Sequence, residues 1–151
     1  MIKILFICHG NICRSPMAEF ILRKMVKDKG IEKDFYIASS ATSTEEIGNP
    51  VYPPARAELK KHGIDTIGKV AVRFTPADYD KYDLLILMDN NNLRNIFRII
   101  DSDPDGKIHK MMDFTSRGGE VADPWYCGNF QKTYEDIYDG CVGLLKSLGI
   151  E

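Results

Sequence analysis

Long hydrophobic runs are missing from this sequence of 151 residues. The longest wholly apolar stretches, Ile4 to Cys8 and Leu84 to Met88, contain five residues each, whereas a helix that crosses a bilayer needs about 18. The apolar run near the N-terminus is also too short for the core of a signal peptide, and no cleavage site of small residues follows it. We therefore expect a cytoplasmic protein without a membrane span.

The sequence also lacks an excess of either charge, since 20 Lys and Arg stand against 22 Asp and Glu for a formal net charge of −2. Such a balance provides no broad basic field, so neither nucleic acid nor a membrane surface is an expected partner. Any site for an anionic ligand has to be local. The length and the hydrophobic share of 44% fit a single globular domain, residues 1–151, with a sizeable core.

Cysteines at the spacing of a metal site are absent as well. The four cysteines contain no Cys-x2-Cys pair, and no His-x3-His pair occurs, so we expect no zinc and no other cofactor. A reducing cytoplasm argues against structural disulfides. The cysteines are therefore candidates for catalysis or redox sensing, and composition does not choose between these roles. They are Cys8, Cys13, Cys127 and Cys141.

Apolar runs of strand length alternate with stretches of helical periodicity along the whole chain. Strands are predicted at 2–8, 35–41, 83–88 and 108–112, with a short extended piece at 70–74 and an irregular surface loop at 42–54. Helices are predicted from Pro16 to the stop at Gly30 and at about 55–62, 91–100 and 129–148. This order predicts an α/β fold with a four-stranded parallel sheet and helices on both faces. Such sheets bind ligands beyond the carboxyl ends of their strands.

The first predicted strand leads directly into the first predicted helix through a polar segment. It consists of Cys8, His9, Gly10, Asn11, Ile12, Cys13, Arg14 and Ser15. Backbone N–H groups of such a loop, at the start of a helix, can turn inward around a tetrahedral dianion. Gly10 and Asn11 tolerate the positive φ that this turn requires. We therefore predict a phosphate-binding loop after the first strand.

Three side chains of this loop have chemistry that suits a phosphoryl group. Arg14 offers a planar fork for two phosphate oxygens, and Cys8 would face the phosphorus. A helix N-terminus beside an arginine favours the thiolate, a nucleophile that needs no neighbouring base. Ser15 can donate a hydrogen bond to that sulfur. The alternative, that Cys8 and Cys13 are merely small buried hydrophobes, leaves the surrounding polar residues without a task.

A nucleophilic thiolate also needs an acid to protonate the leaving oxygen. Asp123 precedes Pro124, Trp125 and Tyr126 on the long loop expected after the last strand. An Asp-Pro pair by itself is a turn initiator. Because the cysteine loop is present, Asp123 becomes a candidate general acid.

The Cys-x5-Arg-Ser segment 8–15, combined with Asp123-Pro124 late in a chain of this length, resembles the low-molecular-weight protein tyrosine phosphatases. The resemblance covers essentially the whole chain and includes 39–49, 62–64, 88–89 and 92–93. It implies hydrolysis of phosphotyrosine and small aryl phosphates through a cysteinyl-phosphate. In that reaction Cys8 is the nucleophile, Arg14 holds the phosphate, and Asp123 serves as general acid and then as base.

The same resemblance implies roles for further residues. Asn11, Ser15 and Ser39 match a network that shapes the loop, and Cys13 matches a second thiol that can trap the oxidised nucleophile as a disulfide. His9, Gly10 and Ile12 join these loop residues as candidate substrate contacts. Trp125 and Tyr126 match the aromatic pair that follows the acid. The expected partners are phosphotyrosine proteins, and the chain is expected to be a monomer or to self-associate weakly.

The sequence departs from the family pattern at Glu45, where better-known eukaryotic members carry an aromatic residue on the pocket wall. The chemistry should be unaffected by this change. The preference among peptide substrates is the property that a glutamate there would alter.

Four other functions remain as alternatives. A related arsenate reductase would need a further pair of cysteines near 84–93, where there are none. Members that resemble phosphoarginine phosphatases carry threonine at the position of Ile12. An inactive module that only binds phosphotyrosine would not need Cys8, Arg14 and Asp123 together. A flavodoxin-like carrier would have no use for a cysteine at the strand end.

Overall fold

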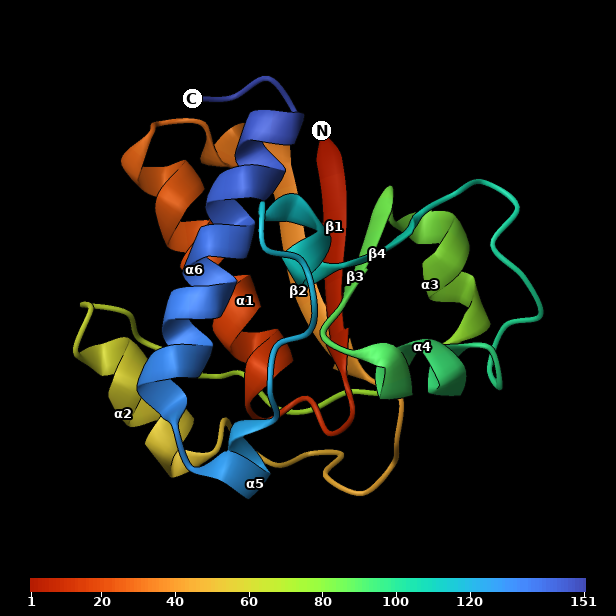
Figure 1. Ribbon diagram of the computed structural model, residues 1–151, viewed down its shortest axis with the longest axis horizontal. Helices are drawn as coiled ribbons and strands as arrows, with labels where there is room; N and C mark the ends of the chain where they lie inside the picture. The colour runs from red at the N-terminus through yellow and green to blue at the C-terminus, as the bar shows by residue number, and fades with distance from the viewer.

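Four parallel strands form one sheet in the computed structural model, which describes residues 1–151. Their order in the sheet is β2-β1-β3-β4, and their bounds are Ile2–Cys8, Phe35–Ala41, Leu84–Leu87 and Ile108–Lys110 for β1 to β4. The first strand is central and pairs with β2 on one side and β3 on the other, with Ile4 opposite Ile37 and Leu84. All four carboxyl ends therefore meet at one edge of the sheet, the lower edge in Figure 1.

Helices cover both faces of this sheet (Figure 1). On one face lie α1 (Arg14–Asp28), α2 (Pro53–Lys60) and α6 (Phe130–Ser147), and on the other lie α3 (Pro76–Lys81) and α4 (Asn90–Ile96). The short α5 (Pro124–Cys127) and the 3-10 helices η1 (Glu32–Asp34) and η2 (Met111–Phe114) complete the fold. The predicted α/β class, with a four-stranded parallel sheet between helices, is confirmed. None of the helices has the length and apolar character that crossing a bilayer requires.

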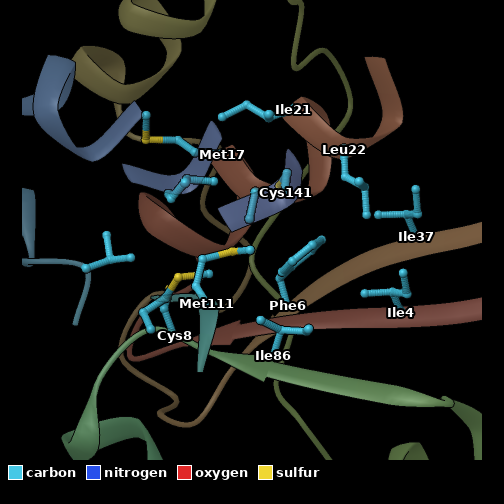
Figure 2. Packing of buried hydrophobic residues seen from close by; sticks show 14 of the residues in the cluster. Ile4, Phe6, Cys8, Met17, Ile21, Leu22, Ile37, Ile86, Met111 and Cys141 are labelled. Atoms are coloured by element: carbon cyan, nitrogen blue, oxygen red, sulfur yellow. The ribbon is translucent and has the colours of Figure 1, made fainter. Parts of the chain in front are cut away.

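The central strand is buried on both faces because its residues point alternately to the two helical layers. Ile4 and Phe6 pack with Met17 of α1 and Cys141 of α6 in the larger cluster (Figure 2). Leu5 and its neighbours pack with α3 and α4 in the smaller one. Cys8 ends the strand at the border of the larger cluster, so the candidate loop starts from a rigid core.

The predicted extended piece 70–74 forms no strand of the sheet and makes only isolated bridges, between Pro50 and Val70 and between Ala41 and Arg73. Val70 and Val72 are 44% and 46% exposed, whereas Ala71 and Phe74 of the same segment are buried. The predicted surface loop 42–54 is correct for its exposed middle. Its ends differ, since Thr42 is buried, Val51 is buried, and α2 already begins at Pro53.

Several helix and strand ends also differ from the prediction. Helix α3 was not predicted from the sequence, although Thr75 and Asp78 form a capping box at its N-terminus. It also missed α5, which has only four residues. The last strand ends at Lys110 rather than at 112, because Met111 and Met112 turn into η2 and are buried. The helix expected to reach 100 ends at Ile96.

Candidate active site

The thiol of Cys8 lies at the end of β1 and is surrounded by hydrogen-bond donors. The backbone nitrogens of Asn11 and Ser15 lie 3.3 and 3.4 Å from its Sγ, and the Ser15 hydroxyl lies 3.0 Å from it. Cys8 is only 3% exposed. Donors that converge on a buried sulfur stabilise its anionic form. This environment is the one expected for a nucleophile and not for an inert core cysteine.

The backbone turn that creates this ring of donors depends on Asn11. It is the only residue other than glycine with a positive φ, at 58°. Its side-chain nitrogen donates to the hydroxyls of Ser15 at 2.8 Å and Ser39 at 2.9 Å, and its side-chain oxygen accepts from the Val72 N–H at 3.1 Å. Of the two residues expected to tolerate a positive φ, Asn11 adopts it and Gly10 does not, so the single left-handed position of the loop falls on Asn11.

A buried carboxylate behind the loop continues this network. The Ser39 hydroxyl donates to Glu19 of α1 at 2.6 Å, and Lys69 donates to the Ser39 carbonyl at 2.9 Å while lying 3.5 Å from Glu19. Burial lowers the pKa of Lys69, and the charge of Glu19 partly opposes this effect. Sequence reasoning missed Glu19 and Lys69. The helical position of Glu19, among apolar residues of the inward face, was the one available signal.

The guanidinium of Arg14 is fixed by groups from two other loops. Its Nη1 donates to Asp89 at 2.7 Å and to the Val121 carbonyl at 2.9 Å, whereas its Nη2 lies 3.5 Å from Asp123. Burial opposes the charge of Arg14, yet the negative charges of Cys8 and Asp89 outweigh it and raise the pKa of the guanidinium. Nε has no hydrogen-bond partner. The sequence did not assign Asp89 this role, although an acid directly after β3 lies at the edge where ligands bind.

The carboxylate of Asp123 is held at the N-terminus of α5. One of its oxygens accepts from the Trp125 N–H at 3.1 Å, which leaves the oxygen near Arg14 on the cavity side. The Trp125 ring packs against Tyr52 at a centroid distance of 4.7 Å, and the Tyr52 N–H donates to the Ile12 carbonyl at 2.8 Å. The loop that carries the acid is therefore tied to the loop that carries the cysteine.

These elements enclose a cavity of about 390 Å³. Its lining residues are Cys8, His9, Gly10, Ile12, Cys13, Arg14, Glu45, Glu46, Asp123, Trp125 and Tyr126. Asn11 and Ser15, which were also candidate substrate contacts, do not line the cavity. Together with Ser39 they form the expected network behind the loop. The walls expected from the sequence, Trp125, Tyr126 and the segment around Glu45 to Ile47, are present except for Ile47.

Two of the lining residues, His9 and Cys13, interact with charged neighbours. His9 pairs with Glu45 at the entrance, with 3.0 Å between Nε2 and Oε2. Cys13 is buried, and this burial together with the negative charge of Cys8 raises the pKa of its thiol. No group of three or more His, Cys, Asp or Glu side chains is placed to hold a metal ion. The cavity can hold a tetrahedral anion between the thiol of Cys8 and the carboxyl group of Asp123.

Comparison with known proteins agrees with this geometry. The family described as Low molecular weight phosphotyrosine protein phosphatase matches residues 3–151. A low molecular weight phosphotyrosine protein phosphatase from Gallus gallus is 38% identical over 147 residues, which cover 96% of this chain and 92% of the relative. The crystal structure of YfkJ from Bacillus subtilis superposes with a TM-score of 0.94 at 35% identity, covering 99% of this chain and 95% of that one. A Drosophila arginine phosphatase superposes with a TM-score of 0.87 at 27% identity, covering 97% and 98%.

Proposed function

The chain belongs to the low molecular weight phosphotyrosine protein phosphatase family, and from this premise we propose that it hydrolyses phosphotyrosine in proteins through a phosphocysteine at Cys8. The observation that carries this proposal is the position of the Cys8 sulfur. Two backbone N–H groups and one hydroxyl surround it on the floor of a cavity whose wall includes the carboxylate of Asp123. A nucleophile and an acid thus face one space.

In the first step the Cys8 thiolate attacks phosphorus and the bond from phosphorus to the tyrosine oxygen breaks. Protonated Asp123 donates its proton to that oxygen, so tyrosine leaves as a neutral phenol. The equatorial phosphate oxygens accept from the loop N–H groups and from Arg14. Nη1 of Arg14 is already used by Asp89 and Val121, and one N–H of Nη2 faces Asp123, so Nε and the other N–H of Nη2 remain for the phosphate.

In the second step Asp123, now a carboxylate, removes a proton from water as the water oxygen attacks phosphorus. The bond between phosphorus and sulfur breaks, inorganic phosphate forms, and Cys8 leaves as a thiolate. The Ser15 hydroxyl, 3.0 Å from this sulfur, can donate to the leaving thiolate and lower the cost of its charge. Asp123 thus donates a proton in the first step and accepts one in the second.

The depth of the cavity supports an aryl phosphate as the substrate. Cys8 is 3% exposed, whereas Tyr126 on the wall is 85% exposed, so the sulfur lies well below the rim. A phenyl ring spans such a distance, but the short side chain of phosphoserine leaves its phosphate above the thiolate. Trp125 and Tyr126 can pack on a substrate ring. We expect kcat/KM to be at least ~100-fold higher for phosphotyrosine peptides than for phosphoserine peptides.

Phosphoarginine is the second candidate substrate, since the structurally similar Drosophila protein is an arginine phosphatase. Ile12 on the cavity floor, where threonine is expected in that class, favours the aryl ester. The comparison is made by measuring kcat/KM for phosphotyrosine peptide, phosphoarginine, p-nitrophenyl phosphate and arsenate side by side. A preference for phosphoarginine would overturn the substrate assignment and leave the Cys8 chemistry intact.

The proposal extends to the cellular compartment of the protein and to its partners. The mechanism needs Cys8 as a free thiol, and all four cysteines are free, so we place the protein in a reducing compartment, the cytoplasm. Its partners are phosphotyrosine proteins, and it acts as a monomer or self-associates weakly.

Replacement of Cys8 by serine tests the covalent mechanism. Cys8→Ser should abolish turnover yet keep vanadate or phosphate binding, because the loop N–H groups and Arg14 remain. The matched control is Cys127→Ser, which changes an exposed cysteine outside the cavity and should leave turnover unchanged. Substantial hydrolysis by Cys8→Ser would refute the phosphocysteine intermediate.

A further inference from the structure

A second hollow, of about 260 Å³, opens beside the cavity of Cys8. His9 lines both spaces and separates them. The hollow lies where the segment after β2 approaches the end of α4, and we call it the arginine hollow. Its lining residues are His9, Thr42, Ser43, Arg73, Asn95, Arg98 and Ile99.

The two arginines of this hollow carry positive charge without a partner. Neither Arg73 nor Arg98 forms an ion pair, and neither side chain makes a hydrogen bond. By contrast, Arg14, Arg23 and Arg117 are each paired with a carboxylate. Two unpaired guanidinium groups at one hollow favour an anionic occupant, since each can present a fork of N–H donors to carboxylate or phosphate oxygens.

Thr42 and Ser43, which also line the hollow, are hydrogen-bonded to the loop that carries Cys8. The Thr42 N–H donates to the Cys8 carbonyl at 3.0 Å, and the Ser43 N–H donates to the His9 carbonyl at 3.1 Å. Thr42 is 6% exposed, and its hydroxyl has no hydrogen-bond partner, which is costly for a buried group. The hollow thus combines an unsatisfied buried hydroxyl with two unpaired cations, and the backbone of Thr42 is hydrogen-bonded to that of Cys8.

Charges of opposite sign lie on the two sides of His9. Glu45 and Glu46 line the cavity of Cys8 but not the hollow, whereas Arg73 and Arg98 line the hollow but not the cavity. A peptide that places its phosphotyrosine over Cys8 therefore meets an acidic rim on one side and a basic hollow on the other. Such an arrangement selects the order of charges in the peptide.

We propose that the arginine hollow is an anion-binding subsite for the substrate, which takes a carboxylate or a second phosphoryl group on a residue near the phosphotyrosine. This inference rests on the proposed function, because it assumes a phosphotyrosine peptide above Cys8. The substrates that it identifies carry an acidic or a second phosphorylated residue on one side of the phosphotyrosine. On the other side, next to Glu45, a basic residue is better tolerated than an acidic one.

A positional scan of peptides tests this subsite. One series carries a single phosphotyrosine with glutamate at each of three positions on either side, and a second series has phosphoserine in place of that glutamate. For wild type, kcat/KM should be about tenfold higher for the peptide that carries the acidic residue at one particular position than for the other peptides of the same series. The two series separate carboxylate recognition from phosphoryl recognition.

Variants of the arginines complete the test. The double substitution Arg73→Gln and Arg98→Gln should remove the positional preference while p-nitrophenyl phosphate hydrolysis stays within about twofold of wild type, which also reports correct folding. Lys27→Gln removes one positive charge at the far end of α1, where Lys27 is exposed and has no partner, and should keep the preference.

The outcomes separate this inference from the proposed function. If wild type hydrolyses phosphotyrosine peptides but shows no positional preference, or if the arginine variant keeps that preference, the subsite is refuted alone. If an acidic residue raises kcat/KM by the same factor at every position, and if this gain falls as much in Lys27→Gln as in the double arginine variant, overall charge is responsible. The subsite is then again refuted. If no phosphotyrosine peptide is hydrolysed, the proposed function fails first.

Discussion

Asn11 and Ser39, 28 positions apart in the sequence, are joined by a hydrogen bond of 2.9 Å between the Asn11 amide nitrogen and the Ser39 hydroxyl oxygen. This bond links the left-handed residue of the catalytic loop to β2. Through Glu19, which accepts from the same hydroxyl, it also links the loop to α1. The shape of the loop therefore depends on side chains that do not line the cavity.

The first prediction separates the backbone conformation of Asn11 from its hydrogen bonds. Asn11→Gly keeps the positive φ available but loses the amide, whereas Asn11→Ala loses the amide and adds strain of roughly 1–2 kcal/mol in the left-handed region. Both should lower kcat about 10- to 100-fold, and Asn11→Ala should also unfold at a lower temperature than Asn11→Gly. Steady-state kinetics and thermal unfolding check this. Equal stability of the two variants would contradict strain at this position.

The second prediction concerns the acid. Asp123→Asn should slow hydrolysis strongly for phosphate esters with poor leaving groups and much less for activated aryl phosphates, because only the former need a proton on departure. The measurement is kcat for a series of aryl phosphates that differ in leaving-group pKa. Asp113→Asn is a matched control, because Asp113 lies in η2 outside the cavity. An equal loss across the series would contradict the role of Asp123 as an acid.

The third prediction concerns Cys13. Peroxide should oxidise the Cys8 thiolate to a sulfenic acid with release of hydroxide, and the Cys13 thiol should then form a disulfide with loss of water. The negative charge of Cys8 is one cause of the raised pKa of Cys13, so its oxidation makes Cys13 easier to ionise. Wild type should recover activity with thiol after peroxide, whereas Cys13→Ser should recover less. Equal recovery of both would refute a protective disulfide.

The fourth prediction concerns Gly143 in α6. A Cβ on Gly143 would clash with the Phe114 carbonyl oxygen. The helix α6 and η2 can therefore pack this closely only because residue 143 is glycine. Helix propensity favours Gly143→Ala by about 1 kcal/mol, but the clash should reverse the sign and destabilise the protein by roughly 1–3 kcal/mol. Denaturant unfolding measures this difference. Gly140→Ala should cost less, since its nearest contacts include the flexible end of Met111.

The fifth prediction concerns stability in acid. Burial alone would raise the pKa of Asp103, but the Tyr79 hydroxyl and the Lys107 and Ile108 N–H groups donate to its carboxylate and lower that pKa. The folded pKa thus lies below the unfolded value of about 3.9, and the unfolded chain binds more protons between the two. This stabilisation is complete above the unfolded pKa and is lost as pH falls through the folded pKa.

Asp103→Asn removes that titration. The free energy of unfolding of wild type should therefore exceed that of the variant at pH 6, and the gap should narrow as the pH falls below about 4. Denaturant unfolding at several pH values tests this expectation. A gap that stays constant over this range would show that Asp103 does not carry the acid dependence.

The sequence by itself determined the features that are contiguous in the chain. The buried strand at 2–8, the polar loop 8–15 and the helix that follows were all visible, because a strand buried on both faces reads as an apolar run and a phosphate loop uses neighbouring backbone N–H groups. The long helix α6 was predicted within one residue at each end, since its inward side chains recur at helical spacing.

Only the tertiary structure decided what the loop is built against. Asp89 reaches Arg14 because parallel strands bring their carboxyl ends to one edge of the sheet whatever their distance in the sequence. Glu19 reaches Ser39 because α1 packs against β2. The arginine hollow was likewise not visible in the sequence, since Arg73 and Arg98 are exposed residues of two separate segments that only the fold brings together. Periodicity reports which face of an element is buried, whereas the partner of a charged side chain depends on how separate elements pack.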